Sequence, residues 1–337
     1  MILEKVSLPG GVNSVGRLVL CPEATPLMAT PSIGARIGGP ALWMKRDDLI
    51  PFGLGGNKIR GLEFMIADAI EMGAATILTG AGPLSNHVRA TVAAATYAGL
   101  RSVVIYWGDS PRRAQGNHLL TEMMGAEIHF THDLDRSSVD RTLAREADRI
   151  SAAGATPYVI PRGGACPLGV LGHVQAVREV LVQAAQQNVR PDLVTLAVGS
   201  GGTVAGWLLG SRLFEAPWRV VGISVSRPAT EVRFHIKRLF EETADMIGYG
   251  ATIDLEEIEI HDQFIGDGYG IPSPLGAETL REVFNAEGIL LDPTYTAKAF
   301  GGYTTLVQRG DYREGAVTLF LHTGGLPSVF VNHEASA

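Results

Sequence analysis

The chain has two cysteines among its 337 residues, no long hydrophobic run and no excess of positive charge. Cys21 and Cys166 are too few for a disulfide scaffold, which favours a reducing compartment, and the N-terminus lacks a signal-peptide pattern. No apolar run reaches the ~18 residues needed to cross a membrane. The net charge of −7 argues against a nucleic-acid partner. We therefore expect a cytoplasmic protein that binds neither nucleic acid nor membrane.

Lysine is scarce, whereas glycine is abundant. Only five of the 28 basic residues are lysines: Lys5, Lys45, Lys58, Lys237 and Lys298. A site that requires a primary amine therefore has few candidates. Glycine, at 41 residues or about 12%, exceeds the usual ~7% and clusters in short loops between apolar runs.

From residue 75 onward, short apolar runs alternate with helical stretches, and the pattern restarts at residue 193. Strands are predicted at 75–79, 101–107, 127–131, 157–160, 193–197, 220–225 and 316–322. Helices are predicted at 86–98, 115–124, 138–152, 169–185, 204–214, 230–247, 276–287 and 295–308. This alternation predicts an α/β fold with two mainly parallel sheets flanked by helices, and a cleft between them.

One glycine-rich segment, Gly199-Ser200-Gly201-Gly202-Thr203, follows a predicted strand and opens a predicted helix. Backbone N–H groups at a helix N-terminus can bind a phosphate, although a tight turn is the alternative. The third glycine of the dinucleotide motif is absent, and no acid ends the next strand, which runs into Ser226-Arg227. The P-loop lysine is missing as well, so a phosphomonoester fits better.

Two further segments could carry chemistry. In Gly55-Gly56-Asn57-Lys58 the lysine could form a Schiff base if its pKa is depressed, although a surface lysine is the simpler reading. Lys298, on a predicted helix, could equally be solvated. In Ser85-Asn86-His87, Ser85 or Asn86 can cap a helix, and the helix start could hold a carboxylate. His87 could titrate near neutrality or simply be exposed.

Three more candidates lie in the C-terminal part of the chain. Tyr269 and Tyr295 stand in glycine-rich or proline-marked loops, where tyrosines usually pack but can serve as acids or bases. Thr323 follows the last strand, where open α/β sheets place their ligands.

Taken in order, these segments resemble the D-cysteine desulfhydrase and 1-aminocyclopropane-1-carboxylate deaminase family. Its members are pyridoxal-phosphate enzymes of fold type II, related to the tryptophan synthase β chain. The similarity is carried by the following pieces: Lys45-Arg46-Asp47-Asp48, Gly55-Gly56-Asn57-Lys58, Ser85-Asn86-His87, Gly199 to Thr203, Asp292-Pro293 with Tyr295, and His322 to Gly325. The resemblance implies a large cofactor-binding domain of 1–57 and 167–337, a small domain of 58–166, and a homodimer.

The resemblance also implies roles for individual residues. Lys58 would carry pyridoxal 5′-phosphate and move the proton at Cα, with Asn57 beside it. Gly199, Ser200, Gly201, Gly202 and Thr203 would bind the phosphate, Asn86 the ring's 3′ oxygen and Thr323 the pyridine nitrogen. Ser85, Asn86 and His87 would lie at the carboxylate of an amino-acid substrate. Leu84, Tyr269 and Tyr295 would line the rest of the pocket, with Ser85 and the two tyrosines as catalytic candidates.

Some positions depart from the family pattern. Gly61 stands where family members often have a second lysine, a candidate phosphate contact. Leu84 replaces a common glutamine, and Ala165-Cys166 replace Ser-Asn, so we expect a less polar pocket end. Thr296 stands where deaminases commonly have a glutamate.

These departures favour desulfhydrase-like β-elimination from a cysteine-like or β-substituted amino acid, giving an α-keto acid and ammonia. The alternatives are 1-aminocyclopropane-1-carboxylate deamination and a specialised biosynthetic reaction, either β-replacement or racemisation. From other classes, a nicotinamide-dependent oxidoreductase or a binding protein without catalysis is also open.

Overall fold

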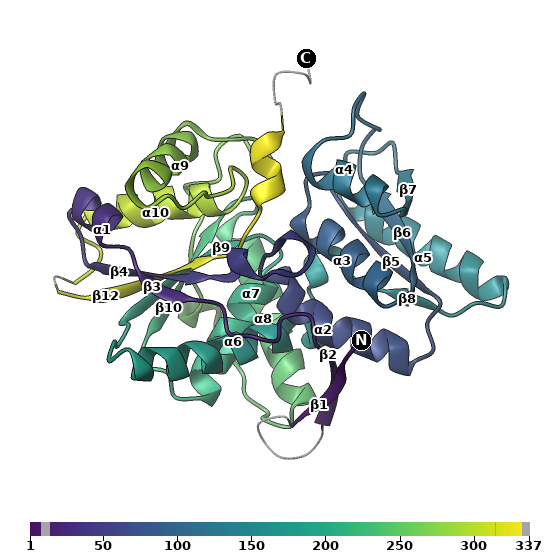
Figure 1. Ribbon diagram of the computed structural model, residues 1–337, viewed down its shortest axis with the longest axis horizontal. Helices are drawn as coiled ribbons and strands as arrows, with labels where there is room; N and C mark the ends of the chain where they lie inside the picture. The colour runs from purple at the N-terminus through teal and green to yellow at the C-terminus, as the bar shows by residue number, and fades with distance from the viewer. Residues whose placement is uncertain (8–13, 314, 332–337) are drawn as a thin grey trace.

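Two mainly parallel sheets, each flanked by helices, form the molecule, which confirms the predicted α/β class (Figure 1). The computed structural model describes residues 1–7, 14–313 and 315–331. In Figure 1 the four-stranded sheet lies on the right and the six-stranded sheet on the left.

The four-stranded sheet is entirely parallel, in the order β7-β6-β5-β8. Its strands are β5 (Thr76–Ala81), β6 (Arg101–Tyr106), β7 (Glu127–Phe130) and β8 (Pro157–Val159). One face packs against α2 (Lys58–Glu71), α3 (Asn86–Tyr97) and α4 (Gly116–Met123). The other face packs against α5 (Ser137–Ala152). Both faces are therefore covered, as the continuous apolar strands predict.

The six-stranded sheet has the order β11-β10-β9-β12-β4-β3, with only the edge strand β3 antiparallel to its neighbour. Its strands are β3 (Leu27–Ala29), β4 (Ala41–Arg46), β9 (Leu193–Val198), β10 (Arg219–Ser224), β11 (Glu259–His261) and β12 (Val317–His322). One face packs against α6 (Pro167–Gln186), α7 (Gly202–Leu213) and α8 (Ala229–Met246). The other packs against α1 (Pro31–Ile37), α9 (Pro274–Glu287) and α10 (Thr296–Gln308).

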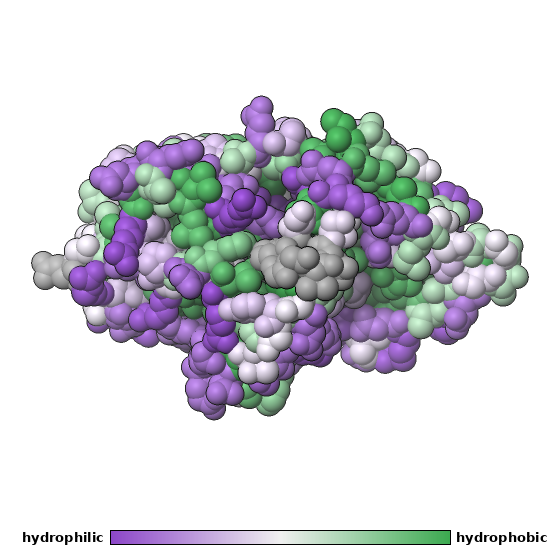
Figure 2. Space-filling view, turned by 90° about the horizontal axis from the view of Figure 1, so that it is seen from below, coloured by the Kyte–Doolittle hydropathy of each residue, from purple (hydrophilic) through white to green (hydrophobic). Residues whose placement is uncertain are grey.

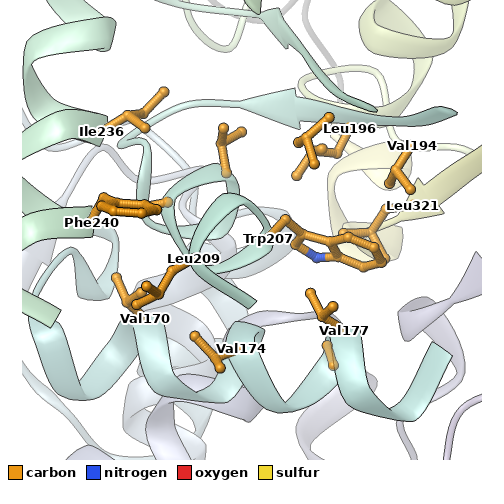
Figure 3. Packing of buried hydrophobic residues seen from close by; sticks show 14 of the residues in the cluster. Val170, Val174, Val177, Val194, Leu196, Trp207, Leu209, Ile236, Phe240 and Leu321 are labelled. Atoms are coloured by element: carbon orange, nitrogen blue, oxygen red, sulfur yellow. The ribbon is translucent and has the colours of Figure 1, made fainter. Parts of the chain in front are cut away.

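The largest buried cluster lies under the six-stranded sheet. Val170, Val174 and Val177 of α6 are spaced to share one helical face, and they pack against α7. Figure 3 shows Trp207 of α7 between these valines and the strand residues Val194 and Leu321. This packing fixes α7, whose first turn faces the cleft described below.

Some elements were not predicted from the apolar pattern. They are the antiparallel hairpin of β1 (Leu3–Ser7) and β2 (Ser14–Leu18), together with β3, β4, α1, α2 and β11. Short 3₁₀ turns complete the fold: η1 (Asp47–Leu49), η2 (Phe52–Leu54), η3 (Arg162–Gly164), η4 (Leu255–Glu257) and η5 (Leu326–Phe330). The division into domains at 58 and 166 stays a prediction.

None of the helices in the described part of the chain is long and apolar enough to cross a membrane. The face seen from below Figure 1 mixes hydrophilic and hydrophobic residues (Figure 2).

Candidate active site

A cleft of about 260 Å³ lies where the carboxyl ends of strands from both sheets meet. Ala81 ends β5, Val198 ends β9 and Thr323 follows β12, and all three line the cleft. Parallel α/β sheets place their ligands at this edge.

Twelve of the residues predicted from the sequence line this cleft together. They are Asn57, Lys58, Ser85, Asn86, His87, Gly199, Ser200, Gly201, Thr203, Tyr269, Tyr295 and Thr323. Two others lie just outside its wall. The Leu84 Cδ1 is 3.3 Å from where a Cβ would stand at Gly270, and Gly202 is the first residue of α7.

Lys58, the first residue of α2, is half-buried and has no carboxylate partner among the described residues. Its Nζ donates a hydrogen bond to the Gly163 carbonyl at 3.1 Å. Burial lowers the pKa of the Lys58 amine to about 8. A much larger fraction of this amine is therefore neutral near pH 7 than of an ordinary lysine, as a Schiff-base lysine requires.

The loop before Lys58 depends on its glycines. Gly55 has φ +73°, and a Cβ there would stand 2.2 Å from the Asp48 carbonyl oxygen. Gly56 has φ +102°, so both positions need a residue without a side chain. The Asn57 N–H then donates to the Thr323 carbonyl at 3.0 Å, which joins the loop to the end of β12.

Arg89 of α3 also holds this loop, and sequence reasoning missed it. The side chain is 2% exposed and donates to the carbonyls of Gly53 and Gly55, and to the Asn117 Oδ1 at 3.2 Å. Burial lowers the pKa of Arg89 to about 10. The available signal was one arginine in the first turn of an alanine-rich helix, two residues after His87.

The loop from Gly199 forms a cradle at the N-terminus of α7. Gly201 has φ +92°, and the Asn57 Nδ2 donates to the Thr203 Oγ1 at 3.0 Å. A Cβ at Gly163 would stand 2.6 Å from the Ser200 Oγ, so this glycine keeps space beside the hydroxyl. Free N–H groups, hydroxyls and a helix N-terminus make this cradle suitable for a phosphate.

The start of α3 faces the same cleft. The Ser85 Oγ caps the helix by accepting from the Val88 N–H at 3.3 Å, and the Asn86 Oδ1 accepts from the Asn117 Nδ2 at 2.8 Å. The N–H groups of Asn86 and His87 belong to the first turn, so they have no partner within the helix. They can therefore bind a carboxylate.

His87 is neither exposed nor titrating near neutrality, contrary to both sequence readings. It is 2% exposed, and its pKa falls to about 3 because of burial and the neighbouring Lys58. Its Nε2 lies 3.4 Å from the Thr79 Oγ1 and 3.3 Å from the Thr91 Oγ1. Its buried Nδ1 has no hydrogen-bond partner among the described residues. His87 is therefore a neutral group with one open ring nitrogen.

The two tyrosines interact directly. The Tyr295 hydroxyl donates to the Tyr269 hydroxyl at 2.9 Å, and burial raises the pKa of both phenols. Asp292 fixes Tyr295 by accepting its backbone N–H at 3.0 Å. Both phenols stay protonated at neutral pH, which makes them proton donors rather than bases.

One carboxylate, Asp140, is found among the described residues that line the cleft, and it pairs with Arg162. Thr296 lies outside this lining, where its Oγ1 donates to the Asp292 Oδ1 at 2.7 Å. Cys166 also lies outside, with its Sγ 3.5 Å from the Met65 Sδ, whereas Ala165 lines the cleft.

Other lysines are engaged elsewhere. Lys298 is 1% exposed rather than solvated, and its Nζ donates to the carbonyls of Ile265 and Gly268 at 2.7 and 2.8 Å. Lys45 is buried in an ion pair with Glu179. Of the five lysines, Lys58 is the one that lines the cleft.

Close packing explains the missing second lysine. A Cβ at Gly61 of α2 would stand 2.6 Å from the Gly169 carbonyl oxygen of α6, and one at Gly172 would stand 2.2 Å from the Arg60 carbonyl. A lysine at position 61 would force the two helices apart. Sequence reasoning noted Ser226-Arg227 after a predicted strand without placing it in this site, and it missed four other residues of the lining: Trp107, Arg136, Arg162 and Arg238.

Comparison with known proteins agrees with this geometry. The family described as pyridoxal-phosphate dependent enzyme matches residues 20–324. The chain is 41% identical over 93% of both chains to a Pyrococcus abyssi protein named, provisionally, as a 1-aminocyclopropane-1-carboxylate deaminase. It is 36% identical to a D-cysteine desulfhydrase of Salmonella typhi, over 94% of this chain and 96% of the relative. A crystal structure of an ACC deaminase homologue superimposes with a TM-score of 0.86 and 37% identity over 93% of each chain.

Proposed function

Because this chain belongs to the pyridoxal-phosphate-dependent enzymes, with relatives of the ACC deaminase and D-cysteine desulfhydrase type, we propose that it catalyses β-elimination from β-substituted α-amino acids. Cysteine-like compounds are the proposed substrates, and an α-keto acid and ammonia are the products. The observation that carries the proposal is the Lys58 amine in a cleft whose β12 end offers the Thr323 hydroxyl rather than a carboxylate.

The residues of the cleft fit pyridoxal phosphate. Lys58 supplies an amine with a depressed pKa, and the 199–203 cradle supplies N–H groups and hydroxyls for a phosphate. Asn86 would hydrogen-bond the ring oxygen, and Thr323 would face the ring nitrogen. When bound, the cofactor supplies an electron sink for the electron pair released at the substrate Cα.

The protein's own groups would orient the substrate and move protons. Ser85 and the first N–H groups of α3 would hold the α-carboxylate. The Lys58 amine, in its neutral form, would take the Cα proton. As the Cβ–X bond breaks, X leaves with its electron pair and can take a proton from Tyr269. Water then releases ammonia and leaves the α-keto acid.

Assays of D- and L-cysteine, β-chloroalanine and 1-aminocyclopropane-1-carboxylate test the proposal. We expect keto-acid formation from at least one cysteine enantiomer or from β-chloroalanine, with the cyclopropane acid a poor substrate. Efficient ring opening without elimination would overturn the choice of reaction. No reaction with any of the four would indicate replacement or racemisation.

A homodimer in the cytoplasm, with domains of 1–57 plus 167–337 and 58–166, also belongs to this proposal. Exposed apolar side chains on the neighbouring elements α4 and η5 support self-association: Leu119, Met123 and Phe330. Light scattering after size-exclusion chromatography would test it, since a single protomer mass would contradict the dimer.

A further inference from the structure

Arg136 is a cation of the cleft wall without an anionic partner in the part of the chain that the structure describes. It precedes the first turn of α5, and its guanidinium carbon lies 5.5 Å from the ring centroids of both Trp107 and Tyr269. Among residues 1–7, 14–313 and 315–331, no carboxylate pairs or hydrogen-bonds with its side chain. The guanidinium therefore keeps its hydrogen-bond donors free at the edge of the cleft.

The other arginines of the lining are already paired. Arg162 donates two hydrogen bonds to Asp140, at 2.9 and 2.7 Å. Arg227 pairs with Glu231, and Arg238 pairs with Glu242 at 2.8 Å. Glu231 also acts on Arg136 at longer range, but it is occupied by Arg227. Counting the described residues of the lining, the cleft thus has one unpaired arginine charge besides Lys58.

This free charge lies on the tyrosine side of the cleft rather than in the phosphate cradle. Tyr295 contacts Gly199 of the cradle, since its ring lies 3.3 Å from the Cβ position there. Tyr269 accepts a hydrogen bond from Tyr295, and the Arg136 guanidinium lies over the Tyr269 ring. Trp107, the other ring under Arg136, covers Gly82 at the turn before Ser85. Arg136 therefore contacts the tyrosine pair rather than the cradle itself, and Trp107 links it to the turn before the proposed carboxylate site.

We propose that Arg136 binds an acidic group on the substrate's side chain, so that the preferred substrate is an α-amino acid whose β-substituent is a sulfonate or phosphate, either of which can leave with the electron pair of its bond to Cβ. The α-carboxylate occupies the start of α3, and the second anion pairs with the Arg136 fork, which suits such oxyanions. This substrate class rests on the proposed function and narrows it, because it replaces the predicted apolar end of the pocket with a cationic one.

The experiment compares the holoenzyme with Arg136→Gln and with Arg141→Gln, an exposed arginine of the same helix that pairs with Asp133 and Asp135. Both variants lose one positive charge, so general electrostatic attraction is matched. Neutral probes are D- and L-cysteine and β-chloroalanine. Anionic probes are D- and L-cysteate and O-phosphoserine, with aspartate as a non-eliminated binding probe. The readouts are kcat/KM and the dissociation constants from titration of the cofactor's absorbance.

We expect the wild type to prefer at least one anionic probe, and added salt to weaken that preference. Arg136→Gln should lower kcat/KM for the anionic probes about 10- to 100-fold, the usual worth of a charged hydrogen bond, with less than about 3-fold change for neutral ones. Arg141→Gln should change neither.

An equal loss for neutral and anionic probes would overturn the proposal, as would a weakened affinity for pyridoxal phosphate itself. Turnover of neutral probes without binding of any anionic one would also overturn it while leaving the proposed function intact. If no amino acid is consumed or changes the absorbance, the proposed function fails and takes this inference with it.

Discussion

Two basic residues near the start of α2 differ in whether a carboxylate pairs with them. On one side, Lys58 faces the cleft with a single backbone carbonyl as its partner. On the other, Arg60 is buried between two carboxylates, with hydrogen bonds to Asp47 at 2.7 and 2.9 Å and to Glu179 at 3.0 Å. Lys45 completes this second group through Glu179 and the Thr25 carbonyl.

This difference separates a structural group from a reactive one. Arg60 offsets the desolvation of Asp47, whose pKa stays below its usual value because of the paired guanidinium. Lys58 has no such compensation, so its proton is held weakly and its nitrogen lone pair is available. A half-buried amine without a counter-charge among its described neighbours is thus a better marker of chemistry than burial or charge alone.

The largest expected effect comes from Lys58→Ala. Turnover should fall by at least about 10³-fold, because both the cofactor anchor and the proton carrier are lost. Some pyridoxal phosphate should still bind, since the 199–203 cradle remains. Kinetics and borohydride reduction followed by peptide mapping measure this, with Lys237→Ala as the control that keeps full activity. A reduced adduct on Lys45 or Lys298 in the wild type would refute the assignment.

Breaking the buried ion pairs of Arg60 should lower the stability of the fold rather than the activity alone. Arg60→Met leaves Asp47 and Glu179 buried with too little positive charge, and we expect a loss of about 3–5 kcal/mol in the free energy of unfolding. The exposed pair of Arg149 with Glu146 provides the control, and Arg149→Met should leave the free energy of unfolding nearly unchanged because solvent screens this pair. Urea unfolding followed by circular dichroism compares them. Equal costs would show that the buried network is not the stabilising element.

The contact that holds α2 against α6 should give a smaller effect. Gly61→Ala places a methyl group against the Gly169 backbone, so we expect a loss of about 1–3 kcal/mol. Gly34→Ala in α1 is the matched control, because its Cβ would meet Leu42 at an ordinary 3.7 Å. That variant should be neutral or stabilised by up to about 1 kcal/mol. The same sign for both variants would contradict the packing argument.

The last prediction concerns the pH at which the Lys58 amine loses its proton. Because the pKa of Lys58 is lowered to about 8, its amine becomes neutral as the pH rises through that value. The rate at which the apoenzyme binds pyridoxal phosphate covalently should therefore rise with pH around 8 and then level off. For an ordinary lysine, the midpoint of this rise would lie near a pKa of ~10.4. Absorbance changes after mixing measure the rate. A midpoint near 10 would mean that Lys58 behaves like a solvated lysine.

Much of the fold and part of the site could be predicted from the sequence. Buried parallel strands are continuous apolar runs, so β5, β6, β9 and β12 were found within two residues of their ends. The loops at 55–58, 85–87 and 199–203 have local signatures of glycine and capping residues. The helix α2 was missed because its apolar residues cover most of its surface, being buried on both sides. Arg136 could not be found, because its neighbours Trp107 and Tyr269 come from distant segments.

The hydrogen bond from Asn57 to Thr323 has a mechanical consequence. It fixes the N-terminus of α2 to the end of β12, and the rest of that helix packs against α6 beside the larger sheet and against α3 beside the smaller one. Lys58 thus stands at a point held by both parts of the molecule, whereas Ser85 precedes α3 and Arg136 precedes α5, two helices that cover the smaller sheet. A shift of the smaller sheet relative to the larger one would therefore change the distance between these substrate-binding groups and the Lys58 amine.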